Sequence, residues 1–286
     1  MNRREFFVAA AAASPSAAAR LPIRKGILLG MLPKELPHAG KFRLAKEVGF
    51  ELMECPTIAS EPEAEEIKRA SETTGVPIHS VMNMAHWQFP LSSADPQVVA
   101  KSVQGMETSL KNAHLWGADT VLLVPAVVNP QTSYADAWKR SQEQIRKLIP
   151  LAEKLKVVIA VENVWNKFLT SPLEFAHYVD EFRSPWVKAY FDVGNVVLFG
   201  YPQDWIRTLG KRIVKLHFKD FALRNEGGKR VADFGNLREG DIDWKEVHRA
   251  LAETGYQGAA TLEVKGGDKT YLADLNRRFD LILNGE

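Results

Sequence analysis

Short apolar runs of strand length alternate with longer segments of helical pattern along this chain, and eight such runs can be counted. A strand that is followed by a helix and another strand forms a parallel pair with a right-handed crossover. Eight such units in a chain of this length predict an α/β fold whose strands close into a (β/α)8 TIM barrel. The expected strands span residues 25–32, 50–55, 78–83, 120–126, 157–162, 187–192, 213–217 and 259–263.

Capping signals mark several of the expected helices. Pro62, Pro96 and Pro172 stand at first helical positions, and glycines follow several helices where a strand is about to begin. A doubly wound open sheet is the alternative, but it usually carries a glycine-rich phosphate turn after its first strand. The segment GMLP at 30–33 offers no such turn, which favours the closed barrel. The expected helices span residues 61–74, 97–116, 134–155, 171–182, 243–254 and 269–283.

Residues 221–242 form a long connection between the seventh expected strand and the helix that follows it. The segment is polar, contains several glycines and exceeds the length of a simple turn. Loops of this length on a barrel are usually functional. We therefore expect a lid or a substrate wall here, with an unstructured surface excursion as the alternative.

The first 19 residues have the pattern of an export signal. Arg3 and Arg4 precede an alanine-rich, mildly apolar run, and residues 17–19 offer a small-residue cleavage site. The paired arginines predict a twin-arginine-type signal and an exported, periplasmic protein, while the alternative is an alanine-rich tail without a transport role. We expect residues 20–286 to form a single barrel domain. The single cysteine, Cys55, excludes an internal disulfide, which agrees with folding in a reducing cytosol before export.

Charge and hydropathy exclude several classes of partner. The formal net charge is +2 and the chain has no basic block, so nucleic acid is not an expected partner. No run of 18 or more apolar residues follows the N-terminal segment, so no membrane span is expected. A small molecule remains the expected partner.

Four chemically active side chains close the last four expected strands. Because the carboxyl ends of parallel barrel strands meet at one face, we expect these side chains to converge. Singly, a strand-end acid is more often a cap or an ion-pair partner, and a strand histidine is more often a core group. Together, three carboxylates and an imidazole suit a hard divalent cation. The predicted metal ligands are Glu162, Asp192, His217 and Glu263.

The motifs around these residues resemble those of the xylose-isomerase-like barrel superfamily. The matching segments are VENVWN (161–166), YFDVGN (190–195), KLHFKD (215–220), GDIDW (240–244) and TLEV (261–264). Within the superfamily they are similar to the sugar phosphate isomerase/epimerase group, which includes the ketose 3-epimerases. The resemblance implies one divalent ion, commonly Mn²⁺ with Mg²⁺ or Co²⁺ as substitutes, and an acid/base pair formed by Glu162 and Glu263. It also implies a sugar substrate and allows a homo-oligomer.

The implied reaction removes a proton from a carbon next to a carbonyl through a metal-stabilised enediolate. The chain departs from the ketose 3-epimerase pattern at Phe168, where a second glutamate is expected, and at Asn195, where a histidine is usual. Epimerase and aldose–ketose isomerase therefore both stay open. Two alternatives are a dehydratase or lyase acting on a keto-inositol or 3-keto glycoside, and a non-catalytic sugar-binding barrel.

Further residues near the expected strand ends are candidates for binding the substrate. Lys219 shares a strand face with His217, with a salt bridge to Asp220 or a neighbour as the alternative. Aromatic faces pack well on sugar C–H groups, which suggests Trp165, although barrel-top packing would also explain it. For the histidines a hydrogen-bonded core or loop position is the alternative. The full set of predicted substrate-binding residues is Lys219, Asn195, Trp165, His79, Glu54, His86 and Arg224.

Overall fold

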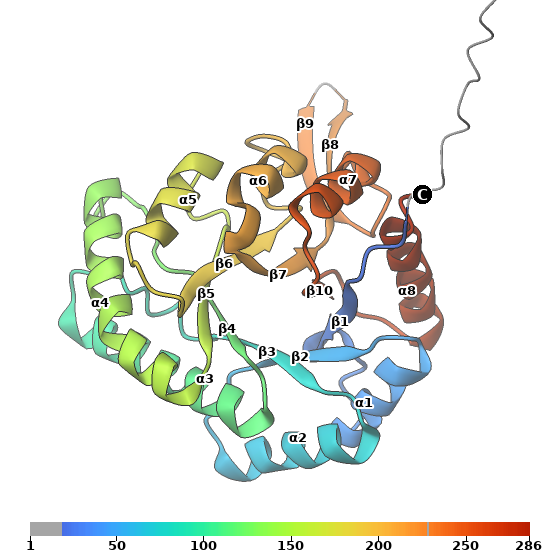
Figure 1. The fold of residues 1–286 in the computed structure, drawn as a ribbon, viewed down its shortest axis with the longest axis horizontal. Coiled ribbons are helices and arrows are strands. Elements are labelled where there is room, and N and C mark those ends of the chain that lie inside the picture. The colour runs from blue at the N-terminus through green and yellow to red at the C-terminus, as the bar shows by residue number, and fades with distance from the viewer. Residues whose placement is uncertain (1–18, 228) are drawn as a thin grey trace, which may run out of the picture.

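The computed structural model describes residues 19–227 and 229–286. Eight parallel strands close into a barrel in the order β1-β10-β7-β6-β5-β4-β3-β2, as the sequence predicts (Figure 1). The barrel strands are β1 Arg24–Leu28, β2 Leu52–Pro56, β3 Ile78–Met82, β4 Thr120–Leu123, β5 Val158–Glu162, β6 Val187–Asp192, β7 Ile213–Phe218 and β10 Ala259–Leu262.

Eight helices surround the barrel within the described residues, together with two 3-10 turns at Leu29–Met31 and Gly210–Arg212. The six expected helices are confirmed, but sequence reasoning missed α1 and α6. Both are short, and neither is capped by a side-chain hydrogen bond, so their starts carry no polar signal. The helices are α1 His38–Glu47, α2 Glu61–Thr74, α3 Pro96–Trp116, α4 Tyr134–Leu155, α5 Pro172–Asp180, α6 Pro202–Leu209, α7 Trp244–Thr254 and α8 Lys269–Leu283.

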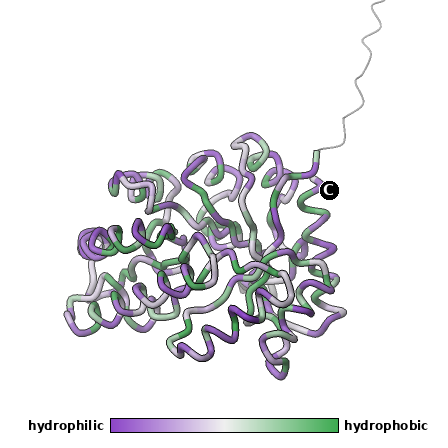
Figure 2. Tube along the Cα trace, turned by 60° about the horizontal axis from the view of Figure 1, so that its bottom comes forward, coloured by the Kyte–Doolittle hydropathy of each residue, from purple (hydrophilic) through white to green (hydrophobic). Residues whose placement is uncertain are grey.

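The main apolar core lies between the barrel and its helices. Apolar and polar residues alternate along the helices, as expected for elements with one buried face (Figure 2). Alternate strand residues face the barrel interior, where Leu122, Ala160 and Tyr190 form a small separate cluster. The interior also buries ionisable side chains completely, among them Glu54 and His217. Such burial is costly unless the groups are paired, which marks this region as functional.

The prediction of a loop over 221–242 is wrong for residues 221–226 and 229–235, which form strands. Strands β8 (Asp220–Glu226) and β9 (Lys229–Gly235) form an antiparallel hairpin directly after β7. Asp220 anchors its base, because its Oδ2 accepts hydrogen bonds from Arg238 N and Trp244 Nε1, both at 2.8 Å. The hairpin projects from the barrel and is mostly polar, so its strands lack the buried apolar runs by which the barrel strands were recognised.

The chain enters the barrel beside its own C-terminal helix. Leu21 N donates to Leu283 O at 2.9 Å, and Arg20 pairs with Asp280 at 2.8 Å. The predicted export signal lies almost wholly outside the described residues. Within the described residues, no helix is long and apolar enough to cross a membrane. Cys55 is buried, as expected of a core thiol.

Candidate metal and catalytic site

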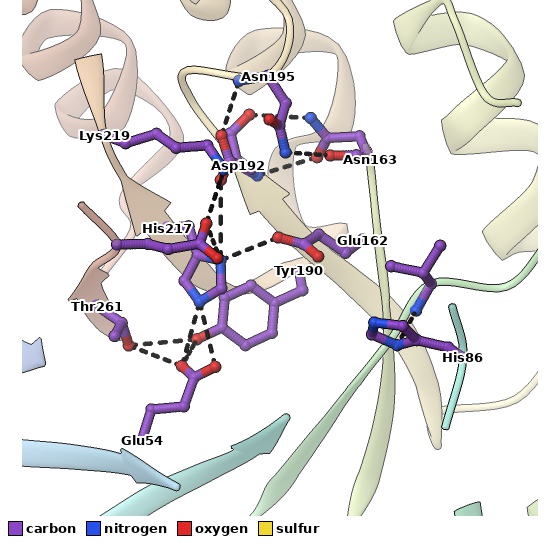
Figure 3. A network of polar contacts seen from close by, with 12 residues as sticks. Glu54, His86, Glu162, Asn163, Tyr190, Asp192, Asn195, His217, Lys219 and Thr261 are labelled. Atoms are coloured by element: carbon purple, nitrogen blue, oxygen red, sulfur yellow. Dashed lines mark hydrogen bonds and ion pairs between the residues drawn. The ribbon is translucent and has the colours of Figure 1, made fainter. Parts of the chain in front are cut away.

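The four predicted metal ligands meet at one end of the barrel. Figure 3 labels Glu162, Asp192 and His217 of this cluster. Glu162 and Asp192 are the last residues of β5 and β6, His217 lies one residue before the end of β7, and Glu263 follows β10. The strand register aligns Asp192 with His217 across β6 and β7. One ligand atom from each side chain lies within 4.8 Å of those from the other three. The sequence thus predicted the convergence correctly, while the metal itself stays a prediction.

His217 stands at the centre of the cluster. Its Nδ1 lies 2.9 Å from Glu162 Oε1, 3.2 Å from Glu263 Oε2 and 3.8 Å from Asp192 Oδ2. Its other nitrogen, Nε2, lies 3.2 Å from Glu54 Oε1. A carboxylate that accepts from one imidazole nitrogen leaves the other nitrogen free to bind a metal. Glu54 therefore orients Nδ1 toward the three carboxylates.

Glu54 is itself held by a buried network. Its Oε2 accepts hydrogen bonds from Tyr190 Oη at 2.5 Å and Thr261 Oγ1 at 3.0 Å. Thr261 Oγ1 also lies 2.9 Å from His79 Nε2. These contacts fix the carboxylate of Glu54, and through it the ring of His217, before any ligand arrives.

Asp192 is positioned by two asparagines. Its backbone N–H donates to Asn163 Oδ1 at 2.9 Å, and Asn163 Nδ2 donates to Asp192 O at the same distance. Asp192 Oδ1 accepts from Asn195 N at 2.7 Å. Its Oδ2 is buried and, among the described residues, accepts no directed hydrogen bond, although Lys219 Nζ lies 2.9 Å away. This oxygen faces the cluster, where its close contact is the ion pair with Lys219.

The donor set fits a divalent cation. Three carboxylates and an imidazole match the ligand preferences of Mn²⁺ and Mg²⁺ sites. Asp192 Oδ2, which accepts no directed hydrogen bond within the described residues, and the oriented Nδ1 of His217 both point to the same space. Lys219 supplies a positive charge in that space, because its Nζ lies 2.7 Å from Glu263 Oε2 and 2.9 Å from Asp192 Oδ2. The alternative reading of Lys219 as an ion-pair partner is confirmed for its neighbours Asp192 and Glu263. Asp220 is not that partner, because it binds the base of the hairpin.

The two glutamates of the cluster have different electrostatic environments. Burial raises the pKa of Glu162 and raises the pKa of Asp192 to about 7. Burial also acts to raise the pKa of Glu263, but His217 and Lys219 overcome it and hold that pKa well below its ordinary value. Burial alone would lower the pKa of His217, yet Glu263, Glu54 and Glu162 raise it well above the usual range. Opposed shifts in neighbouring carboxyl groups are typical of an acid/base pair.

A cavity of about 210 Å³ opens directly onto the cluster. His86 is one of its walls, and its Nδ1 accepts a hydrogen bond from Val124 N at 3.2 Å. Burial lowers the pKa of His86 to about 4, so the imidazole is neutral at pH 7. The lining residues are Met82, His86, Trp87, Glu162, Val164, Trp165, Asn195, Lys219, Phe234 and Glu263.

The predicted substrate-binding residues divide into two groups. His86, Trp165, Asn195 and Lys219 line the cavity, and their binding role stays a prediction. The others do not line it: Glu54 is fully buried behind His217, His79 is buried against Thr261, and Arg224 is exposed on β8.

Phe168, which stands where a second glutamate was expected, also lies away from the cavity. It is buried and packs against Tyr134, Trp138 and Tyr178, which are side chains of α4 and α5.

Sequence reasoning missed several residues that build the site. Tyr190 and Thr261 lie two positions before Asp192 and Glu263. Because side chains two apart share a strand face, this spacing would have identified both. Asn163 directly follows Glu162, so its position in the sequence would also have identified it as a neighbour of the site. Trp87 lies on the connection after β3 and Phe234 on the hairpin strand β9, and no local pattern predicts the path of either segment.

Comparisons with known proteins give a consistent result. A family model described as "Xylose isomerase-like TIM barrel" matches residues 42–279. The chain is 26% identical over 260 residues to the L-ribulose-5-phosphate 3-epimerase UlaE of Escherichia coli O1:K1 / APEC, an alignment covering 85% of this chain and 88% of that protein.

Two solved structures share the fold. The 3-keto-D-glucoside 4-epimerase YcjR of E. coli superposes with a TM-score of 0.74 at 16% identity, covering 89% of this chain and 98% of that one. An L-ribulose 3-epimerase superposes with a TM-score of 0.74 at 18% identity, covering 90% and 93%.

Proposed function

The chain belongs to the xylose isomerase-like TIM barrel family, and from this premise we propose that it is a sugar epimerase or aldose–ketose isomerase. The observation that carries the proposal is the meeting of Glu162 and Glu263 with Asp192 and His217 beside a cavity that suits a sugar. The epimerases among its relatives and structural neighbours support an isomerase-class enzyme.

The proposed chemistry is proton transfer at a carbon next to a carbonyl. A divalent ion, for which we propose Mn²⁺, would be held by Glu162, Asp192, His217 and Glu263 and would supply Lewis-acid stabilisation of the developing oxyanion. Glu162 and Glu263 are the carboxylates that face both the cluster and the cavity, so they can hold and return the proton. Asn163 and Glu54 keep Asp192 and His217 in place. If the two glutamates approach opposite faces of the carbon, the stereocentre is inverted.

The cavity favours an unphosphorylated substrate. At about 210 Å³ it is smaller than the pockets of roughly 300–1,000 Å³ that take drug-sized ligands, so it suits one sugar ring. Among the described residues that line it, Lys219 is the one permanent cation, and its ammonium already contacts two carboxylates. Among these lining residues, a doubly charged phosphate would meet one lysine and the two carboxylates of Glu162 and Glu263. We therefore infer a neutral sugar with a carbonyl group.

Deuterium incorporation from heavy water tests the proposed reaction. The protein is incubated with Mn²⁺ and a panel of ketoses and 3-keto glycosides, and NMR identifies the labelled carbon. Glu162→Gln and Glu263→Gln are each expected to slow exchange by about 10²–10⁴-fold, the usual contribution of a general acid or base. The exposed Glu143→Gln serves as the matched control.

The products separate the alternatives. Loss of water or of an aglycone would identify a lyase, and binding without any exchange would identify a non-catalytic sugar-binding barrel. Either result would contradict the proposal.

We also propose that the protein is exported through its twin-arginine-type signal. The support is in the sequence of residues 1–19, where Arg3 and Arg4 precede an alanine-rich run. Cell fractionation should find the protein in the periplasm, and a variant with both arginines replaced by lysine should stay in the cytoplasm. Periplasmic delivery of that variant would contradict the proposal.

A further inference from the structure

Three aromatic side chains at the cavity mouth are far more exposed than a packing role requires. Trp87, Trp165 and Phe234 line the cavity, yet they are 56%, 41% and 41% exposed. They come from three separate segments, which follow β3, follow β5 and belong to β9. Exposed aromatic groups that gather at one cavity commonly mark a binding surface.

The aromatic side chains are held in place by their neighbours. Trp165 Nε1 donates to Asn195 O at 2.9 Å, and its ring centre lies 4.8 Å from that of Phe234. Phe221, fully buried at the start of β8, packs edge-on against Trp165 at 5.2 Å. The hairpin thus supports a two-ring platform, defined by Trp165 and Phe234.

Trp87 is fixed from another side of the cavity. It packs edge-on against His86 with ring centres 5.3 Å apart, and His86 is in turn held by Val124 N. Rigid aromatic surfaces of this kind lose little conformational entropy on binding a ligand.

We propose that Trp87 and the Trp165–Phe234 platform bind a second pyranose ring that is joined to the reacting sugar, so that the substrate is a glycoside. This proposal rests on the proposed function. The cavity next to the cluster has room for about one ring, and the aromatic side chains line the part that opens to solvent. The C–H faces of a pyranose pack on aromatic rings while its hydroxyl groups stay hydrated. A free monosaccharide would leave these aromatic faces uncovered.

Binding of non-reactive glycosides tests this directly. The full chain, with and without Mn²⁺, is titrated calorimetrically with methyl glycosides of several configurations and with the matched disaccharides. In the native protein the best disaccharide is expected to bind about tenfold more tightly than its methyl glycoside, as expected for one or two aromatic contacts. Trp87→Ala and Phe234→Ala should each reduce this advantage, measured as the ratio of disaccharide to methyl glycoside affinity within the same variant.

Tyr201→Ala is the matched control, because Tyr201 is exposed but does not line the cavity. The proposal is overturned if no disaccharide binds more tightly than its methyl glycoside, or if the advantage survives in both variants. Tighter binding of a matched aryl glycoside would also overturn it in favour of an aromatic aglycone. Because these ligands do not react, the result is independent of the exchange experiment. If the disaccharide binds more tightly but no deuterium exchange is found, the proposed reaction is contradicted and the proposed second sugar site stands.

Discussion

Replacing Lys219 with methionine is expected to destabilise the metal-free protein and to strengthen metal binding. The Lys219 ammonium contacts Glu263 Oε2 at 2.7 Å and Asp192 Oδ2 at 2.9 Å, which are two of the atoms that would bind the ion. Burial acts to lower the pKa of Lys219, but Asp192 and Glu263 raise it above its ordinary value, so the group stays charged. Methionine keeps the length of the stem and removes the charge.

The size of both effects follows from the ion pairs. Removing one partner of a buried ion pair costs about 3–5 kcal/mol, and the free energy of unfolding in chelator should fall by that amount. A divalent cation would replace the lost charge in the variant, whereas in the native protein it must displace the ammonium. The displaced ammonium keeps part of its interaction energy through other contacts, so only the remainder opposes metal binding in the native protein. Since each 1.4 kcal/mol is a factor of ten, the affinity for metal should rise about 10–100-fold in the variant.

Urea denaturation in chelator and in Mn²⁺, together with calorimetric titration of Mn²⁺, measures both quantities. Lys111→Met on the exposed face of α3 is the matched control, for which neither quantity should change. A Lys219→Met protein that is as stable as the native one in chelator, or that binds Mn²⁺ more weakly, would refute the argument. In that case Lys219 would not compete with the ion.

Three further changes have defined outcomes. Burial lowers the pKa of His86 from 6.5 to about 4. Between these pH values the imidazole is protonated in the unfolded chain but not in the folded one, so the free energy of unfolding decreases as the pH falls. The loss by pH 4 should be about 3 kcal/mol, and urea titrations of His86→Asn should show a flatter pH dependence. Glu54→Gln should weaken Mn²⁺ binding about 10–100-fold in a calorimetric titration, because it disturbs the partner that orients His217. Gly194→Ala should lower the free energy of unfolding by about 1–3 kcal/mol in urea, since its Cβ would lie 2.6 Å from Lys219 Cγ and 2.9 Å from Lys219 O.

The barrel and the convergence of the candidate metal ligands could be predicted because both depend on regular patterns. Apolar runs between helical segments identify parallel strands, and parallel strands bring their carboxyl ends together. Glu162, Asp192 and Glu263 therefore had to meet once the strand count was right. His217 followed from the same argument.

Depth inside the barrel could not be predicted in the same way. His79 is the second residue of β3 and lies three residues before the end of that strand. At about 3.3 Å per residue this places it roughly 10 Å below the strand end, too deep to reach the cavity. Glu54 lies two residues before the end of β2, and its carboxylate already forms hydrogen bonds with His217, Tyr190 and Thr261. The position of a strand end, which sequence patterns give only to within one or two residues, thus decides whether a side chain contacts the substrate or supports a candidate metal ligand.

The hairpin links the metal cluster to the cavity mouth through Lys219. The Lys219 ammonium lies 4.9 Å from the ring centre of Phe234 and also contacts Asp192 and Glu263. If a metal ion displaces the Lys219 ammonium from these oxygens, the ring of Phe234 remains as a neighbouring partner of the ammonium. A cation over an aromatic face is stabilised by the ring. Because Phe234 belongs to the proposed second-ring platform, the state of the metal cluster and the shape of the cavity mouth share one side chain. The candidate metal cluster and the hairpin are therefore physically coupled.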